Sequence, residues 1–175
     1  ADIEPFPGGQ FLEYAEIADI LDRYLPACVE AGFRWVEVSD NVVDVNLDWK
    51  VNLIGRAVTG HGLKVFGEVG KKEGLAHGPS FLDDAQACLD AGASIILLEA
   101  AELVSGDPDT MREVEAVVDV VGLDRVMFEL PGPWIAGVNA HDVHKMRRDL
   151  IDRYGSEVNV GNVTPDELFS FEAYR

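Results

Sequence analysis

The stretch Ala27-Cys28-Val29-Glu30-Ala31-Gly32 returns almost unchanged as Ala87-Cys88-Leu89-Asp90-Ala91-Gly92, 60 residues further along the chain. Both copies close a segment with helical spacing of apolar residues, and both precede a short run of strand-forming residues. A glycine in this place is a common helix-ending signal. Two units within 60 residues give about 30 residues each, the size of a strand with its crossover helix. The repeat therefore predicts parallel βα units.

Strands and helices alternate on both sides of this repeat. Helical spacing predicts, among others, one helix over Ala15–Ala31 and another over Ser80–Ala91, with Ser80 as its N-cap. Six βα units fit in the 175 residues. The predicted strands are five apolar runs and a weaker one near the start of the sequence: Trp35–Val38, Lys64–Val69, Ser94–Glu99, Arg125–Leu130, Glu157–Val160 and Asp2–Phe6.

Two folds accommodate six parallel βα units. Length favours an open doubly wound sheet, because a closed (βα)₈ barrel typically takes ~250 residues. Polar residues at successive strand ends favour the barrel, because its strand ends surround one common mouth. We predict an α/β fold of the TIM-type (βα)₈ barrel class. Residues 1–175 would form a single barrel domain that lacks its first two βα units.

The charge limits the classes of partner. The chain carries 32 acidic and 14 basic residues, a net charge of −18, and five of the basic residues are lysines. Such a surface repels phosphate backbones and anionic lipids, so we expect neither nucleic-acid nor membrane partners. No apolar run approaches the ~18 residues of a membrane-spanning helix. Two cysteines do not make a disulfide framework, which predicts a cytoplasmic location.

Glutamates recur at the predicted strand ends. Glu37, Glu68, Glu99 and Glu129 lie 31, 31 and 30 residues apart, and Asn159 follows 30 residues later. Carboxylates around one mouth repel one another unless a cation or a lysine offsets their charge. Oxygen ligands without a histidine or cysteine cluster favour Mg²⁺. The alternative is that these glutamates cap helices or pair with arginines at the rim.

Two of the five lysines follow one of these glutamates, in the run Glu68-Val69-Gly70-Lys71-Lys72-Glu73-Gly74. Glycines let the backbone come close to an anion, and a lysine there can bind a phosphate or carboxylate or act as a general acid. The alternative is a solvated turn. Two further loops could bind anions or be ordinary turns: Phe6-Pro7-Gly8-Gly9-Gln10, and Asn159 to Asn162 before Thr164.

In this order, these runs resemble the phosphosulfolactate synthase family, and the resemblance covers nearly the whole chain. Its most specific part is Glu68-Val69-Gly70-Lys71-Lys72. The other similar runs are Phe6-Pro7-Gly8-Gly9 with Glu13-Tyr14-Ala15, Val36-Glu37-Val38-Ser39-Asp40, Leu89-Asp90-Ala91-Gly92 with Ile96-Leu97-Leu98-Glu99, Val126-Met127-Phe128-Glu129, Val158-Asn159-Val160 with Asn162, and Phe171-Glu172-Ala173-Tyr174-Arg175.

The resemblance implies a (βα)₈ barrel whose first two units precede Ala1. It also implies a lyase that adds sulfite to phosphoenolpyruvate with Mg²⁺, giving (2R)-phospho-3-sulfolactate on the way to coenzyme M. Lys71 would be the general acid, and Glu68 would help to set its pKa. The other residues that the resemblance marks are Gly8, Gly9, Ser39, Lys72, Asn159 and Asn162 for the substrates, and Glu37, Glu99 and Glu129 for the metal.

Two departures from the family pattern keep other functions open. Asn41-Val42-Val43 stands where the family often has small residues, and Ala101 stands where the synthases carry an arginine. The alternatives are a phosphate-binding barrel enzyme of aldolase type, which would use Lys71 or Lys72 as a Schiff base, and a non-catalytic relative similar to plant heat-stress proteins. Because an incomplete barrel exposes strand edges, we also expect a homo-oligomer or a need for the missing portion.

Overall fold

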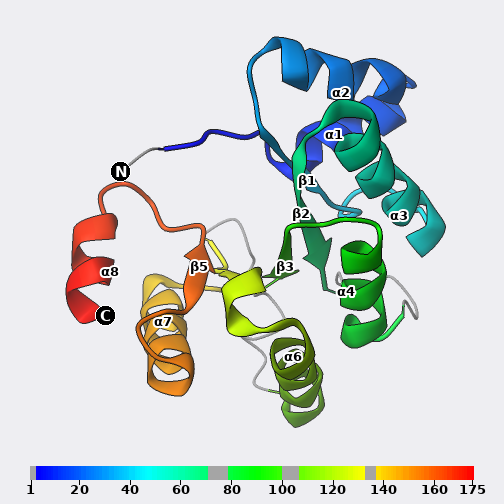
Figure 1. Cartoon of the computed structure of the whole chain (residues 1–175). Helices are drawn as coiled ribbons and strands as arrows, with labels where there is room; N and C mark the ends of the chain where they lie inside the picture. The colour runs from blue at the N-terminus through cyan, green and yellow to red at the C-terminus, as the bar shows by residue number, and fades with distance from the viewer. Residues whose placement is uncertain (1–2, 71–78, 100–106, 133–136) are drawn as a thin grey trace. The chain divides into compact units, whose positions relative to one another are not determined.

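The structure is a computed structural model that describes residues 3–70, 79–99, 107–132 and 137–175 (Figure 1). Its contacts divide the chain into two compact units, residues 1–96 and 97–175. The prediction of a single domain over residues 1–175 is not tested by this division and stays a prediction. In the described ranges, no helix is both long and apolar enough to cross a membrane.

The first unit contains two strands with helices before, between and after them. Its elements are α1 (Gly9–Ile17), α2 (Leu21–Glu30), β1 (Trp35–Val38), α3 (Leu47–Gly55), the π-helical turn η1 (Arg56–Gly60), β2 (Lys64–Val69) and α4 (Phe81–Asp90). Strands β1 and β2 pair in parallel, with Val36 level with Val65. From Val65 to Val69 every residue of β2 is buried, as expected for a parallel strand covered on both faces.

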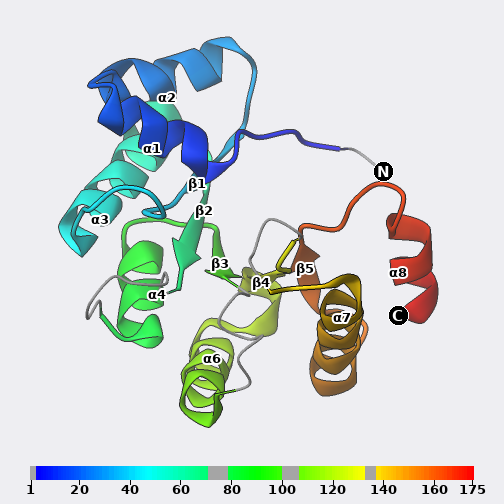
Figure 2. The same cartoon turned by 180° about the vertical axis from the view of Figure 1, so that it is seen from behind.

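The second unit repeats the pattern, and β3 (Ile95–Glu99) crosses the boundary between the units. The elements that follow β3 are α6 (Pro108–Val121), the short 3₁₀ turn η2 (Leu123–Arg125), β4 (Val126–Glu129), α7 (Ala140–Tyr154), β5 (Asn159–Gly161) and α8 (Leu168–Tyr174). Strands β4 and β5 pair in parallel, with Phe128 level with Val160. Helices α7 and α8 lie side by side, as the rear view shows (Figure 2).

The strand order is β1-β2-β3-β4-β5. Strands that follow one another in chain order, each joined to the next through a helix, are characteristic of a (βα) barrel, whereas a doubly wound sheet reverses its order at a switch point. The predicted fold class is therefore confirmed: the chain is an α/β protein that forms part of a TIM-type barrel.

Each copy of the sequence repeat forms the end of a helix, α2 in the first copy and α4 in the second. Gly32 and Gly92 both have positive φ, 87° and 106°, a conformation that glycine adopts at no steric cost. In each copy the next residue donates its N–H across the turn, from Phe33 to Cys28 O at 3.0 Å and from Ala93 to Cys88 O at 2.9 Å. These bonds satisfy carbonyls that the helix end leaves unpaired, and they direct the chain into the next strand.

Two predictions about the elements are wrong. The helix predicted over Ala15–Ala31 is divided between α1 and α2, because Asp19 adopts a φ of 55° between them. Aspartate tolerates this left-handed conformation, and periodicity alone gives no sign of it. The weak strand over Asp2–Phe6 does not form, since residues 3–6 have no regular secondary structure. The part of the chain that the structure describes therefore has five strands rather than six.

Candidate functional site

The four glutamates of the 30-residue series lie where the sequence predicts, at or near the carboxyl ends of strands. Glu37 is the last residue but one of β1, Glu68 the last but one of β2, and Glu99 and Glu129 end β3 and β4. Glu68 is 3% exposed, and the other three are half-buried. Glu37 and Glu68 belong to the first unit, and Glu99 and Glu129 to the second.

In the first unit, Glu37 and Glu68 project from the same face of the strand pair. Glu37 is level with Phe66, and side chains two residues apart on a strand share a face. Gly67 lies on the opposite face, where a Cβ atom would be 3.0 Å from Cys88 of α4. The two glutamates therefore point away from α4, on the face where Phe66 stacks on Phe6.

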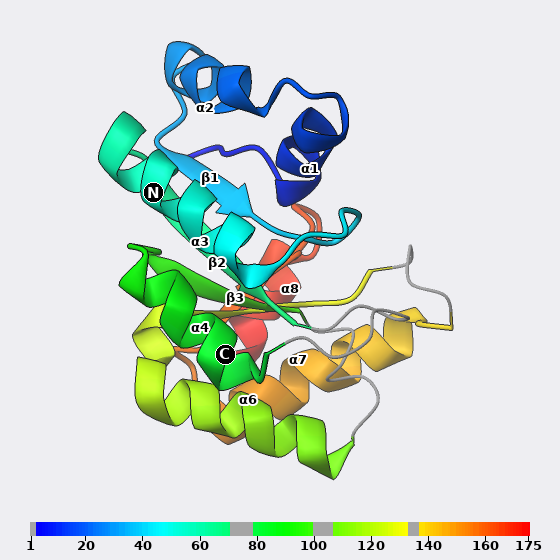
Figure 3. The same ribbon diagram turned by 90° about the vertical axis from the view of Figure 1, so that its right-hand side faces the viewer.

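The start of α1 meets the end of β1 (Figure 3). Gly9 donates its N–H to Glu37 Oε1 at 2.9 Å. A Cβ atom at Gly9 would lie 2.7 Å from the same oxygen and would also collide with Ser39 Oγ. The structure thus brings together two predicted substrate-binding residues, Gly9 and Ser39, and the predicted metal ligand Glu37. Gly8 is the N-cap of α1, next to this group.

Glu13 was not among the predicted site residues, yet it is completely buried beside them. Its carboxylate accepts hydrogen bonds from Ser39 Oγ and from the backbone N–H of Val42. These bonds fix the Ser39 hydroxyl and the turn after β1. The signal in the sequence is its position between Leu12 and Ala15, which are buried on the same helix.

Lys50 was also missed, and it is among the largest fully buried side chains that the structure describes. Its Nζ donates to Asp84 Oδ2 at 2.8 Å and to the backbone oxygen of Glu68 at 3.0 Å, and it lies 3.4 Å from Asp40 Oδ1. Burial works to lower the pKa of Lys50, but the two carboxylates outweigh it and the pKa is raised. Burial raises the pKa of Asp84, and Lys50 offsets part of this shift. The cluster joins α3 and α4 to the ends of β1 and β2.

In the second unit, the end of β4 contacts the residue that follows β5. Asn162 donates through Nδ2 to Glu129 Oε1 at 2.7 Å and to Leu130 O at 3.1 Å. Asn159 lies at the start of β5 and donates to the carbonyls of Leu123 and Val126, at 3.3 and 3.1 Å. Asn162 thus accompanies a predicted metal ligand, whereas the Asn159 amide holds the chain at the beginning of β4.

Lys71, Lys72 and Ala101 lie outside the described residues. Within the described ranges, no group of three histidine, cysteine, aspartate or glutamate side chains is arranged to hold a metal ion. Mg²⁺ commonly binds through one or two carboxylates together with water and substrate phosphate, so single strand-end glutamates remain chemically suitable ligands.

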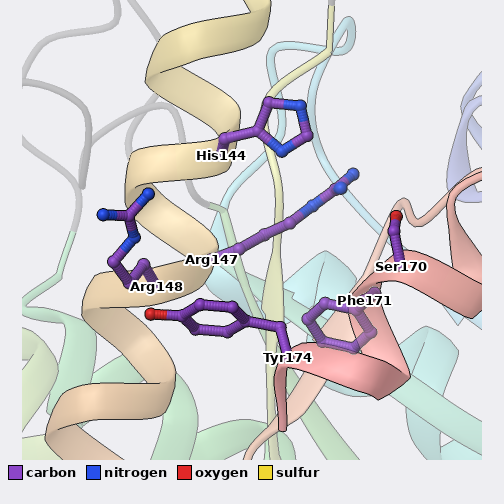
Figure 4. Close-up of a pocket in the computed structure, with 6 residues that line it drawn as sticks. All are labelled: His144, Arg147, Arg148, Ser170, Phe171 and Tyr174. Carbon is purple, nitrogen blue, oxygen red and sulfur yellow. The ribbon is translucent and has the colours of Figure 1, made fainter.

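A separate pocket of about 160 Å³ lies between α7 and α8 (Figure 4). Arg147 and Phe171 are buried in its wall, and the guanidinium of Arg147 lies 5.9 Å from the Phe171 ring centre. Arg147 Nη2 donates to Glu167 Oε2 at 2.7 Å, which holds the pKa of Glu167 below its usual value. The residues that line the pocket are His144, Arg147, Arg148, Ser170, Phe171 and Tyr174, none of which was predicted as a site residue.

Known proteins similar to this chain belong to the family that its sequence runs resemble. The family model of (2R)-phospho-3-sulfolactate synthase (ComA) matches residues 1–175. The phosphosulfolactate synthase of Methanothermobacter thermautotrophicus is 31% identical over 185 aligned positions, which cover 99% of this chain and 67% of that protein. The enzyme of the same name from Methanocaldococcus jannaschii is also 31% identical, over 99% of this chain and 68% of its own length. The chain thus spans about two thirds of each curated relative.

Similar solved structures are more distant. A 2,3-dimethylmalate lyase of the PEP mutase/isocitrate lyase superfamily superposes with a TM-score of 0.45 at 17% identity, over 89% of this chain and 63% of the other. The 3-keto-D-glucoside 4-epimerase YcjR of E. coli gives 0.40 at 16% identity, over 97% of this chain and 74% of the other.

Proposed function

Since the chain belongs to the (2R)-phospho-3-sulfolactate synthase family of carbon–sulfur lyases, we propose that its full-length protein adds sulfite to phosphoenolpyruvate to give (2R)-phospho-3-sulfolactate. The observation that carries this proposal is the group formed by Gly9, Glu37 and Ser39 at the carboxyl end of β1. Catalytic residues of (βα) barrels come from these strand ends. The Phe6–Gly9 run and the Val36–Asp40 run, both of which resemble the family, meet at this point.

The proposed reaction balances in two steps. The sulfur lone pair of sulfite forms a bond to C3 of phosphoenolpyruvate, and the electrons of the C2–C3 double bond move onto the carboxylate. C2 then takes a proton as the carboxylate is restored. The proposed donor is the ammonium of Lys71, which follows β2 in the sequence and regains its proton from water. Glu68, three residues before Lys71, is the neighbour that we propose helps to set the pKa of this lysine.

Negative charge must be stabilised in such a reaction, because both substrates are anions and more charge gathers on the carboxylate. We propose Glu37, Glu99 and Glu129 as carboxylate ligands of Mg²⁺, since hard oxygen donors suit this ion. When bound, Mg²⁺ would supply a positive charge to the substrate carboxylate. Glu37 and Glu129 already have fixed orientations, through the hydrogen bonds from Gly9 and Asn162.

The remaining proposed contacts are to the substrate anions. Backbone N–H groups at Gly8 and Gly9 stand at the start of α1, where a helix favours negative charge. The Gly9 N–H is already used by Glu37, so its proposed role is to orient that carboxylate. Ser39 is held by Glu13, so its proposed role is to keep a hydroxyl oxygen in a fixed position. Lys72 and Asn162 complete the proposed set. Asn159 is not part of it, because its amide donates to the carbonyls of Leu123 and Val126 at the beginning of β4.

The proposal is tested with the full-length protein, phosphoenolpyruvate, sulfite and Mg²⁺. Consumption of phosphoenolpyruvate should require sulfite, and the Lys71→Ala variant should lose activity by about 10²–10⁴-fold. Lys145→Ala, which removes an exposed lysine of α7, is the matched control and should keep the wild-type rate. Equal rates in the Lys71→Ala and wild-type proteins would remove the lysine from the mechanism. An imine trapped by borohydride would instead indicate aldolase-type chemistry.

A further inference from the structure

Lys50 is a fully buried cation that the proposed reaction does not use. It is 1% exposed and lies on α3, on the same helix face as the buried residues Leu53 and Ile54. Burying an ammonium is costly unless it is paired and hydrogen-bonded. A leucine or methionine in this place would pack without that cost. Packing alone therefore does not account for a lysine here.

The surroundings of Lys50 match its donors. The ammonium has three N–H groups, and three oxygen atoms surround it, from Asp84, from Asp40 and from the backbone of Glu68. Asp84 is itself held on its other oxygen, which accepts a bond from Cys88 Sγ at 3.6 Å. Because its N–H groups point to protein oxygen atoms, the Lys50 ammonium can hold in place the residues that carry these oxygen atoms.

The groups that it holds are the two strand ends of the candidate site. The Glu68 carbonyl belongs to the last residue but one of β2, three residues before Lys71 in the sequence. Asp40 follows Ser39, two residues beyond the end of β1. Asp84, on α4, anchors the ammonium from the other side.

We propose that Lys50 is a positioning residue, whose ammonium fixes the carboxyl ends of β1 and β2 and so sets the place of Glu68 and of Gly70, the residue that follows β2. This inference rests on the proposed function for its kinetic consequence. Its structural consequence, a strand end that loosens when the ammonium is removed, is independent of what reaction the protein performs. Displacement of a catalytic group by about 1 Å can cost about 100-fold in rate.

Replacing both Lys50 and Asp84 by uncharged side chains distinguishes a positioning role of Lys50 from a role as the counter-ion of Asp84. Lys50→Met alone leaves the Asp84 carboxylate buried without its partner, and such a protein can fail for that reason. The Lys50→Met/Asp84→Asn protein removes both charges and keeps the volume. The single Asp84→Asn variant keeps the ammonium on the Glu68 carbonyl. Lys145→Met/Asp149→Asn makes the same changes in an exposed pair on α7, whose atoms lie 2.6 Å apart, and is the matched control.

In the full-length protein, Lys50→Met/Asp84→Asn should melt within a few degrees of wild type but lose about 100-fold in kcat/KM, mainly through kcat. Backbone amides of residues 64–70 should exchange hydrogen at least about 10-fold faster. Asp84→Asn and the α7 control should not show this faster exchange. If the double variant does not fold, Lys50→Gln/Asp84→Asn is measured in its place, with the same criteria.

Wild-type kcat/KM and wild-type exchange in a folded neutral variant would overturn the proposal, leaving Lys50 as the counter-ion of Asp84. If the wild-type protein shows no sulfite-dependent reaction, the proposed function fails, and the exchange measurement alone then decides the role of Lys50. Fast exchange at residues 64–70 in the double variant would still support it.

Discussion

The backbone N–H of Gly9 donates to Glu37 Oε1 at 2.9 Å, so the first residue of α1 and the end of β1 are locked together. The carboxylate lies at the positive end of the helix, where negative charge is stabilised. Because the contact is this close, the helix can approach the strand only if residue 9 has no side chain.

We expect Gly9→Ala to destabilise the protein by about 1–3 kcal/mol, because the added methyl group collides with Ser39 and Glu37. Urea unfolding measures the change. Gly55→Ala is the control, since Gly55 has helical φ and ψ and open space around its Cβ position, and it should stabilise by about 0.5–1 kcal/mol. A Gly9→Ala protein as stable as wild type would contradict the close approach.

Glu37→Gln should weaken Mg²⁺ binding while preserving the fold. The glutamine oxygen can still accept the Gly9 N–H, so the melting temperature should hardly change. Loss of the negative charge should raise the Mg²⁺ concentration for half-maximal activity by about 10-fold or more. Calorimetric titration with Mg²⁺ gives the same information without turnover. Glu30→Gln, at an exposed position in α2, is the control, and identical titrations of both variants would exclude Glu37 as a ligand.

The pair of Arg147 and Glu167 predicts a pH-dependent contribution to stability. The hydrogen bond from Arg147, with a second from Thr164, lowers the pKa of Glu167 in the folded protein. A carboxyl whose folded pKa is lowered stabilises the fold above its unfolded pKa and loses that contribution as the pH falls through the folded value. Glu167→Gln should therefore cost about 1 kcal/mol near neutral pH, and the difference from wild type should shrink towards about pH 3. A difference that stays constant with pH would contradict this role.

The two cysteines should be inert in the folded protein. Cys28 and Cys88 are free and buried, and burial raises the pKa of both thiols, so the reactive thiolate is rare. A thiol reagent should label neither residue in the native protein within minutes and both after denaturation. Rapid native labelling of either residue would show that its surroundings open in solution.

Local patterns predicted the strands well, and with them the glutamates at their ends. Each strand run is short, apolar and followed by polar residues, so its position follows from nearby residues. Lys50 escaped prediction because its partner Asp84 is 34 residues away, and a charged residue in a helical segment is normally assigned to the solvent. A signal was present, since Lys50 shares the buried face of α3 with Leu53 and Ile54. The break at Asp19 depends on one backbone angle, which periodicity does not report.

The most direct measurement of the central claim is carbon NMR of phosphoenolpyruvate labelled with ¹³C at C3, incubated with the full-length protein, sulfite and Mg²⁺. The account predicts that the vinyl resonance disappears and that a saturated carbon bonded to sulfur replaces it, with phosphate still attached to C2. Unchanged phosphoenolpyruvate in the presence of folded protein and both co-reactants, or a product that forms equally without sulfite, would contradict the account.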